Sequence, residues 1–246
     1  MKRKLLTRCN RSRRRRIIGY RACGMTETEV KIPWERPVAD ALVLIASHGY
    51  RLIAPRTLEI DQLFDRPSGE LRQSGLVLRL REAAEVATVT YKGPATRETY
   101  KSREEIEFDV SDPDAFQTVL DRLGYHPRFR YEKYRTEFSD PVESGLIMLD
   151  ETPVGVFLEL EGLGDWIDRT ASRLGFSKTD YSTASYHSIY QLYREKNPAA
   201  PPDMTFGIEA FPGTLTKQPK IATKAFIRQG ADDILLVAQV VLGRNC

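Results

Sequence analysis

Residues 26–34 read TETEVKIPW, and Glu27, Glu29 and Lys31 occupy every second position of this stretch. Successive side chains of a β-strand point to opposite faces. An extended chain here therefore gathers two carboxylates and an ammonium group on one face and apolar groups such as Val30 on the other. The fold must explain why a strand carries one wholly charged face.

The same alternation recurs in four later segments, with mostly apolar or aromatic residues between the charged positions. An antiparallel sheet with one solvated face explains a single segment of this kind. Five segments are harder to explain in that way, because their alternate sites are Glu, Arg and Lys almost without Ser, Thr or Gln. The later segments are Arg79-x-Arg81, Arg103-x-Glu105-x-Glu107, Lys133-x-Arg135 and Glu159-x-Glu161.

We therefore predict strands that close into a barrel, with the charged faces inward and the apolar faces outward against helices. Lys92 and Asp150 add single charges at the ends of apolar strands. Desolvated ions are costly unless opposite charges or water accompany them, so we expect a hydrated tunnel that selects an anion. Its interior would hold the cations Lys31, Arg79, Arg81, Lys92, Arg103, Lys133 and Arg135, and the acids Glu27, Glu29, Glu105, Glu107, Asp150, Glu159 and Glu161.

A triphosphate chelated to a metal ion uses both kinds of side chain. Arg binds phosphate oxygens in pairs, and Lys supplies a compact positive charge. Clustered carboxylates bind hard divalent cations such as Mg²⁺ or Mn²⁺.

Helical periodicity and capping residues predict four helices, and the chain between them is rich in strand signals. Similar helix positions after the first strand and after the strand at 101–110 suggest two pseudo-symmetric halves. The predicted helices cover 37–48, 112–124, 165–174 and 183–196. The predicted strands after the first cover 50–64, 76–81, 87–92, 101–110, 128–138, 146–150 and 156–161.

Composition divides the 246-residue chain into three parts. Residues 1–24 carry ten Lys and Arg and no acid, which leaves 27 basic against 34 acidic residues in 25–246. We predict a disordered basic leader or a start codon assigned too far upstream, and the alternatives are a targeting peptide and an RNA-binding arm. Residues 25–197 form the predicted domain, and the Pro-rich stretch that begins at 198 opens a linker and tail through 246.

Cysteine and histidine positions argue against metal sites of the zinc type. Cys9, Cys23 and Cys246 fall outside the predicted domain, which favours a reducing cytoplasm over a disulfide framework. The scattered His48, His126 and His187 are predicted to be ordinary surface or packing residues. No apolar run is long enough for a membrane-spanning helix, so we expect no membrane partner.

With these motifs in order, residues 26–193 resemble the CYTH superfamily of triphosphate tunnel enzymes, which includes class IV adenylate cyclases, thiamine triphosphatases and inorganic triphosphatases. Arg66 departs from the small Thr that often follows Asp in the family's second motif. The motifs are the ExExK signature at Glu27 to Lys31, LFDRPSGELRQSGLVLRLR (63–81), TYKGP (90–94), REEIEF (103–108), KYR (133–135), LDETPVGVFLELEG (149–162) and SYHSIYQLY (185–193).

The resemblance implies an α+β fold, a closed antiparallel eight-stranded β-barrel that forms a tunnel, with helices packed outside. It implies that Lys31, Arg79, Arg81, Lys92, Lys133 and Arg135 bind the triphosphate, with Arg103 in support. It also implies that Glu27, Glu29, Asp150, Glu159 and Glu161 bind one or two Mg²⁺ or Mn²⁺ ions, while Glu105 and Glu107 line the tunnel near them. As catalytic residues we take Lys31, Arg81, Lys92, Glu105 and Glu107.

The expected substrate is ATP, inorganic triphosphate or thiamine triphosphate. The motif layout most resembles bacterial class IV adenylate cyclase-like proteins, and hydrolysis of a triphosphate is the first alternative. A non-catalytic module that binds polyphosphate or nucleotide is the second. The motifs reveal no base-reading pocket, we expect no nucleic-acid partner, and a homodimer is compatible with the resemblance.

Overall fold

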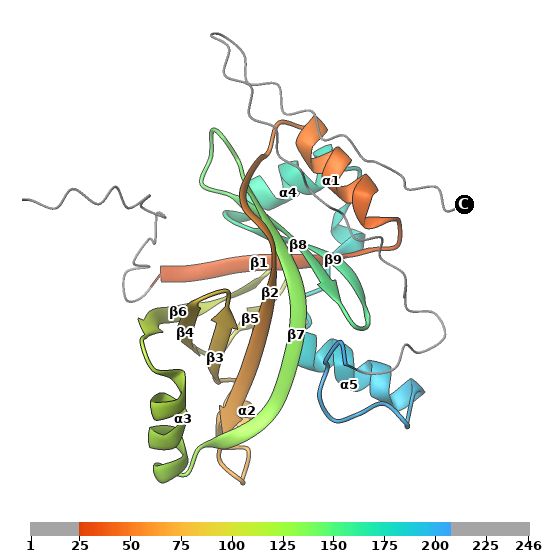
Figure 1. Cartoon of the computed structure of the whole chain (residues 1–246). Coiled ribbons are helices and arrows are strands. Elements are labelled where there is room, and N and C mark those ends of the chain that lie inside the picture. Colours follow the sequence, from red (N-terminus) through yellow and green to blue (C-terminus); the bar gives the residue numbers. More distant parts are fainter. Residues whose placement is uncertain (1–24, 208–246) are drawn as a thin grey trace, which may run out of the picture. The chain divides into compact units, whose positions relative to one another are not determined.

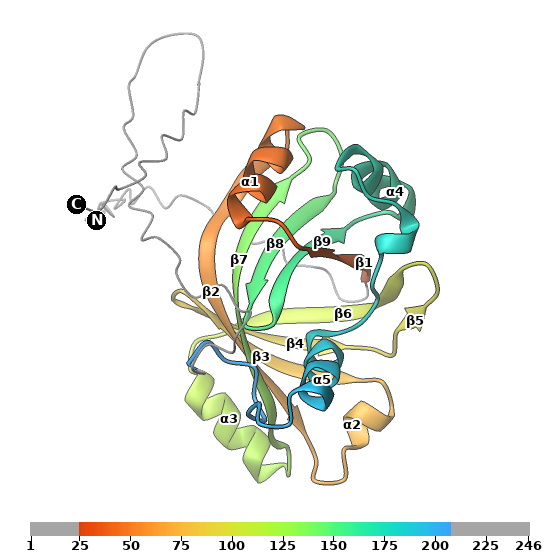
Figure 2. The same ribbon diagram turned by 90° about the vertical axis from the view of Figure 1, so that its right-hand side faces the viewer.

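The computed structural model describes residues 25–207, in which strands dominate and helices lie around them (Figures 1 and 2). The strands are β1 (Met25–Trp34), β2 (Arg51–Asp65), β3 (Val77–Ala83), β4 (Val86–Lys92), β5 (Thr96–Arg97), β6 (Lys101–Val110), β7 (His126–Ser139), β8 (Leu146–Thr152) and β9 (Gly155–Glu161). The helices are α1 (Val38–Ser47), α2 (Glu70–Gln73), α3 (Pro113–Arg122), α4 (Gly164–Arg173) and α5 (Tyr186–Lys196), with a 3₁₀ turn, η1 (Lys178–Asp180).

Strand β1 closes the barrel, because it pairs with β9 on one side and with β6 on the other. The ring runs β1-β9-β8-β7-β2-β3-β4-β6 and returns to β1, and every pairing in it is antiparallel. The two-residue strand β5 adds a short pairing to β6. The prediction of a closed eight-stranded antiparallel barrel is confirmed.

The outward faces of the strands form the hydrophobic cores, as the alternation predicted. Val30 and Ile32 of β1 are fully buried in a cluster with apolar side chains of β8 and β9. Ala41 and Ile45 of α1 and Trp166 of α4 pack against this cluster. In both views α1 and α4 lie together over one part of the barrel (Figures 1 and 2). The charged positions of β1 therefore face the barrel interior.

Helix α3 covers a second outward surface, whereas α5 does not. Leu120 of α3 packs with Leu80 and Val89, which face outward from β3 and β4. Tyr186 and Tyr190 of α5 instead pack with Phe129 and other residues that share the inward face of the charged positions. The prediction placed all four long helices outside the barrel, but α5 packs against inward-facing side chains because these are aromatic at its end of the barrel.

The two halves of the barrel are related by topology. Exchanging β1–β4 with β6–β9 leaves the order of neighbours in the ring unchanged. Helices α1 and α3 occupy equivalent positions, each between the first and second strand of its half. The suggestion of pseudo-symmetric halves is confirmed at the level of topology.

Residues 198–207 pack onto the barrel. Met204 is fully buried, its backbone N–H donates to Arg130 O at 3.0 Å, and its carbonyl accepts from Glu132 N at 2.8 Å. Strand β8 pairs with β7 from Tyr134 onward, so this segment covers the part of β7 that β8 does not reach. The first ten residues of the predicted linker thus belong to the folded structure. The basic leader, the remaining tail and the three cysteines lie outside the described residues.

None of the helices within residues 25–207 is long and apolar enough to cross a membrane.

Candidate functional site

A cavity of about 690 Å³ runs through the barrel and is lined by the inward faces of the strands. It follows β7 from Phe129 to Glu137, which corresponds to about 25 Å of extended chain. Ten basic side chains and eight carboxylates line it. Thirteen of the fourteen residues predicted to face the tunnel are among them, and Asp150 is the exception.

Arg79 and Arg81 of β3 are held by Glu59 and Asp61 of β2, which share the inward face of the barrel but do not themselves line the cavity. Arg81 Nε lies 2.8 Å from Asp61 Oδ1, and its Nη1 lies 3.0 Å from Glu59 Oε2. Arg79 Nε lies 3.4 Å from the same Asp61 oxygen. Burial opposes ionisation of Asp61, but Arg81 and Arg79 outweigh it and lower the pKa of this carboxyl. The two arginines are therefore charged, and their contacts with Glu59 and Asp61 fix the orientation of their side chains.

Lys133 and Arg135 of β7 share one buried acid, Asp150 of β8. Asp150 Oδ2 accepts from Lys133 Nζ at 3.0 Å and from Arg135 Nη2 at 2.6 Å, and Oδ1 accepts from Arg135 Nε at 2.7 Å. The Tyr186 hydroxyl donates to Oδ2 at 2.6 Å. Burial raises the pKa of Asp150, but Arg135 and Lys133 overcome this and hold it far below its usual range. Asp150 thus fixes two cations of the wall.

The carboxylates of β1 and β9 are interleaved with ammonium groups. Lys31 Nζ lies 2.9 Å from Glu159 Oε2 and 3.3 Å from Glu29 Oε1, and Lys101 Nζ also bonds to Glu29. Burial disfavours the charged Lys31, but Glu159 and Glu29 raise its pKa. Burial lowers the pKa of Lys101 to about 8.

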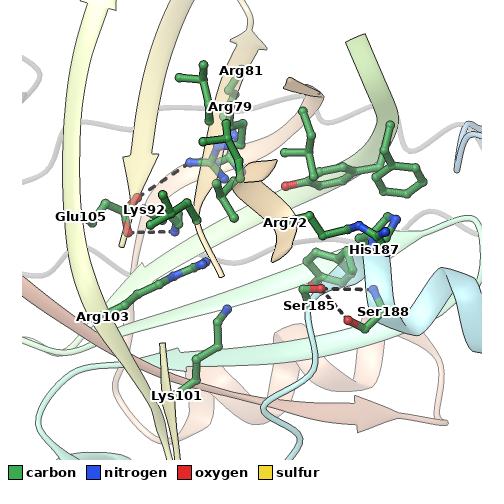
Figure 3. Close-up of a pocket in the computed structure, with 18 of the residues that line it drawn as sticks. Arg72, Arg79, Arg81, Lys92, Lys101, Arg103, Glu105, Ser185, His187 and Ser188 are labelled. Carbon is green, nitrogen blue, oxygen red and sulfur yellow. Dashed lines mark hydrogen bonds and ion pairs between the residues drawn. The ribbon is translucent and has the colours of Figure 1, made fainter. Parts of the chain in front are cut away.

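Glu27 and Glu105 meet at a single ammonium group. Lys92 Nζ lies 2.9 Å from Glu27 Oε2. It also lies 2.8 Å from Glu105 Oε2 (Figure 3). Burial raises the pKa of Glu27, and its neighbours Glu105 and Glu29 add to the rise against the opposing Lys92. The raised pKa reflects burial and repulsion among these carboxylates, and a bound divalent cation would relieve both.

The oxygen-only donor set of the carboxylates fits a hard divalent cation. No group of three or more His, Cys, Asp or Glu side chains in residues 25–207 is arranged as a ready-made metal site. Mg²⁺ usually keeps several waters and is bound by one or two protein carboxylates together with substrate phosphates. Glu27 and Glu29, which lie two residues apart on the inward face of β1 and both line the cavity, meet that requirement.

Arg103 provides a donor without an assigned partner. Its Nε is buried and has no hydrogen-bond partner among the described residues, and its side chain points toward the cavity (Figure 3). A phosphate oxygen would satisfy this donor.

The CYTH domain model matches residues 25–171. The chain belongs to the CYTH domain family. A relative from Methanocaldococcus jannaschii, named "putative adenylate cyclase", is 29% identical over 136 residues, which cover 55% of this chain and 74% of the relative.

Solved structures support the same fold. A "putative adenylate cyclase" from Vibrio parahaemolyticus superposes with a TM-score of 0.60 at 23% identity, covering 68% of this chain and 99% of that one. A Hippeastrum protein superposes with a TM-score of 0.53 at 18% identity, and the match covers 68% of this chain and 96% of that one. That protein is described as a "putative adenylyl cyclase" with "a dominant" triphosphatase activity. Identities this low support the fold alone.

Several residues that line the cavity, or that pair with residues lining it, were not predicted from the sequence. Glu59-x-Asp61 has the same alternation as the other charged segments. Lys101 lies two residues before Arg103 and so continues the alternation of that segment. The sequence pattern could therefore have identified these three residues. His187 was predicted to be an ordinary surface or packing residue, but it lines the cavity because α5 lies at the barrel end. Tyr186 and Arg72 line it too, and no charge alternation marks them.

Proposed function

We propose that this CYTH domain is a divalent-metal-dependent enzyme that acts on a triphosphate-containing substrate in the tunnel. The supporting observation is that seven strands bring basic or carboxylate side chains to one cavity of the barrel. A module that only binds an anion needs the cations but has no use for so many carboxylates. The non-catalytic alternative is therefore the weaker one.

The basic side chains bind the triphosphate in this proposal. Arginine forks pair with phosphate oxygens, and lysines add compact charge. The buried acids Asp61 and Asp150 orient them before the substrate arrives, so little reorganisation is needed during the reaction. The binding residues are Lys31, Arg79, Arg81, Lys92, Arg103, Lys133 and Arg135.

Carboxylates facing the cavity hold Mg²⁺ or Mn²⁺, and when bound such an ion neutralises charge that develops on the phosphates. Glu27, Glu29, Glu159 and Glu161 face the cavity directly. Asp150, which was predicted with them, reaches a cation in the cavity only if its pairs with Lys133 and Arg135 open.

The primary reaction is that of a class IV adenylate cyclase. The ribose 3′-oxygen of ATP forms a bond to the α-phosphorus, the bond from that phosphorus to the bridging oxygen breaks, and pyrophosphate leaves. In this proposal Glu105 or Glu107 accepts the proton of the attacking hydroxyl. Lys31, Arg81 and Lys92 stabilise charge on the transferred and leaving phosphates. The name of the M. jannaschii relative supports this choice.

The alternative reaction is attack of water on the terminal phosphorus, which releases orthophosphate. The same cations and carboxylates serve it, and the Hippeastrum protein is described as having triphosphatase activity. The two reactions differ in the nucleophile, which the tunnel residues do not specify.

An assay panel tests the proposal. The full chain is incubated with ATP, inorganic triphosphate or thiamine triphosphate, each with Mg²⁺ or Mn²⁺, and the products are separated. Cyclic AMP with pyrophosphate supports the cyclase, and orthophosphate without cyclic AMP supports the triphosphatase. The absence of every product with every substrate would contradict an enzymatic role.

A further inference from the structure

The side chains that line the tunnel change along its length from charged to aromatic. Residues at every second position of β7 share the inward face. This face reads Arg135, Lys133, Tyr131 and Phe129 toward the start of the strand, and all four line the cavity. On β9 the inward residue beyond Glu159 is likewise aromatic, at Phe157. A second kind of binding surface therefore continues from the charged part.

Helices α2 and α5 complete this end of the cavity, which we call the α2–α5 mouth. Figure 3 shows Arg72 of α2 beside His187 of α5, away from Lys101 and Arg103. The mouth is lined by Leu63, Leu71, Arg72, Phe129, His187 and Gln191.

The side chains of the mouth are held in place. The carboxylate of Asp65 accepts backbone N–H groups of Leu71 at 2.9 Å and Arg72 at 3.0 Å, which fixes the loop that carries Arg72. The His187 ring packs edge-on against Phe129, with 4.8 Å between the ring centroids. Gln191 Nε2 lies 3.4 Å from His187 Nε2. The mouth is therefore preorganised, which lowers the cost of binding a ligand.

An inorganic triphosphate has no group that such a surface recognises, since all its outer atoms are phosphate oxygens. Apolar walls with a few fixed polar groups are typical of sites for organic ligands, and the cavity volume lies in the range of about 300–1,000 Å³ found for them. The mouth therefore favours a triphosphate that carries an organic group.

The charged side chains of the mouth determine which organic group of a triphosphate fits there. Arg72 and Arg128 both line this end and would repel a cationic thiazolium ring. Asp65 is the one carboxylate among the described residues of this end, and backbone N–H groups already occupy it. A neutral base suits the site better, because guanidinium planes stack on bases and a neutral imidazole offers one donor and one acceptor. Burial and Arg72 lower the pKa of His187, which keeps the imidazole neutral.

We propose that the α2–α5 mouth binds the base of a nucleoside triphosphate whose phosphates occupy the charged part of the tunnel. This inference rests on the proposed function and deepens it, because it disfavours inorganic triphosphate and thiamine triphosphate as the preferred substrates. His187, Gln191 and the guanidinium plane of Arg72 are the specificity residues.

Isothermal titration of the full chain tests this inference. ATP, inorganic triphosphate and thiamine triphosphate are titrated in EDTA, so that metal-dependent turnover does not intervene. The variants are His187→Phe, Gln191→Leu and Arg72→Lys, which leave the charge and the shape of the mouth nearly unchanged. Arg122→Lys, an exposed site on α3 away from the cavity, is the matched control.

Each of the three mouth variants should weaken ATP binding about 10-fold, which corresponds to about 1.4 kcal/mol of binding free energy. The affinity for inorganic triphosphate should change less than about 2-fold. Wild-type protein should bind thiamine triphosphate at least about 10-fold more weakly than ATP. Unchanged ATP affinity in all three variants would overturn the inference while leaving the proposed function intact, as would equal losses for both ligands. Failure of the wild-type chain to bind any of the three compounds, both in EDTA and with excess Mg²⁺, would overturn both.

Discussion

The Tyr186 hydroxyl of α5 donates a 2.6 Å hydrogen bond to Asp150 Oδ2 of β8. The same carboxylate orients Lys133 and Arg135 of the tunnel wall. The Tyr186 ring also lies 5.2 Å from the Nζ atoms of both Lys31 and Lys133, in cation–π geometry. The placement of α5 is thereby linked to the spacing of the cations that face the cavity.

Tyr186→Phe removes this hydrogen bond and keeps the ring. Because the acceptor is a buried charged group, the free energy of unfolding should fall by about 1.5–3 kcal/mol. Tyr190→Phe is a matched control, since its hydroxyl donates to the neutral carbonyl of Pro201 at 2.8 Å and should contribute about 0.5–1.5 kcal/mol. Urea denaturation measures both, and equal losses would contradict the role assigned to Asp150.

Arg81→Ala should weaken binding of inorganic triphosphate about 10- to 100-fold, because a hydrogen bond to a charged group contributes about 1.5–3 kcal/mol. Arg122→Ala on α3 is the control and should leave the affinity unchanged. Titration calorimetry of the two variants measures their affinities for inorganic triphosphate. An unaltered affinity of Arg81→Ala would remove Arg81 from the binding residues.

Glu159→Gln should separate binding from turnover. The substitution removes a negative charge that lies 2.9 Å from Lys31 Nζ and 3.2 Å from Arg135 Nη2, so metal-free binding of triphosphate should stay equal or tighten. Turnover with Mg²⁺ should fall about 100-fold or more if Glu159 helps to hold the metal, in line with losses of about 10²–10³ for one transition-state contact. Retained turnover in this variant would contradict the metal role.

The barrel could be predicted from the sequence because the alternation of charged residues that indicates it is a local pattern within each strand. Alternation at Glu27, Glu29 and Lys31 depends on strand periodicity alone, and the structure places all three in the cavity. The position of α5 was not predictable in this way, since its tyrosines have the spacing of any helix that packs against a core. Asp150 has the parity of a tunnel residue, but its environment is set by Tyr186, which lies 36 residues further along the chain. Long-range partners of this kind leave no pattern in one sequence.

Lys101 should make stability depend on pH in an alkaline window. Burial lowers its pKa from 10.5 to about 8, so between these values the unfolded chain keeps a proton that the folded chain has lost. Stability then rises with pH across the window, by up to about 3 kcal/mol. Denaturation from about pH 8 to about pH 10.5 should show this rise in the wild type relative to Lys101→Met. A constant difference between the two proteins would contradict it.

His187 should titrate below its usual pKa of 6.5, because burial and Arg72 both disfavour its protonation. The midpoint can be followed by NMR of the imidazole carbon and nitrogen signals. Arg72→Gln should move the midpoint upward, since it removes the positive charge, whereas Arg122→Gln should not move it. A wild-type midpoint above 6.5 would be inconsistent with the half-buried position of His187 beside Arg72.

The most direct test is a crystal structure of the full chain with Mn²⁺ and an ATP analogue that has a methylene group between its α and β phosphorus atoms. We expect phosphates between the side chains of Arg79, Arg81 and Lys133, with anomalous Mn²⁺ signal beside the tunnel carboxylates. Phosphates and metal bound outside the barrel, with the charged cavity left to water, would contradict this expectation.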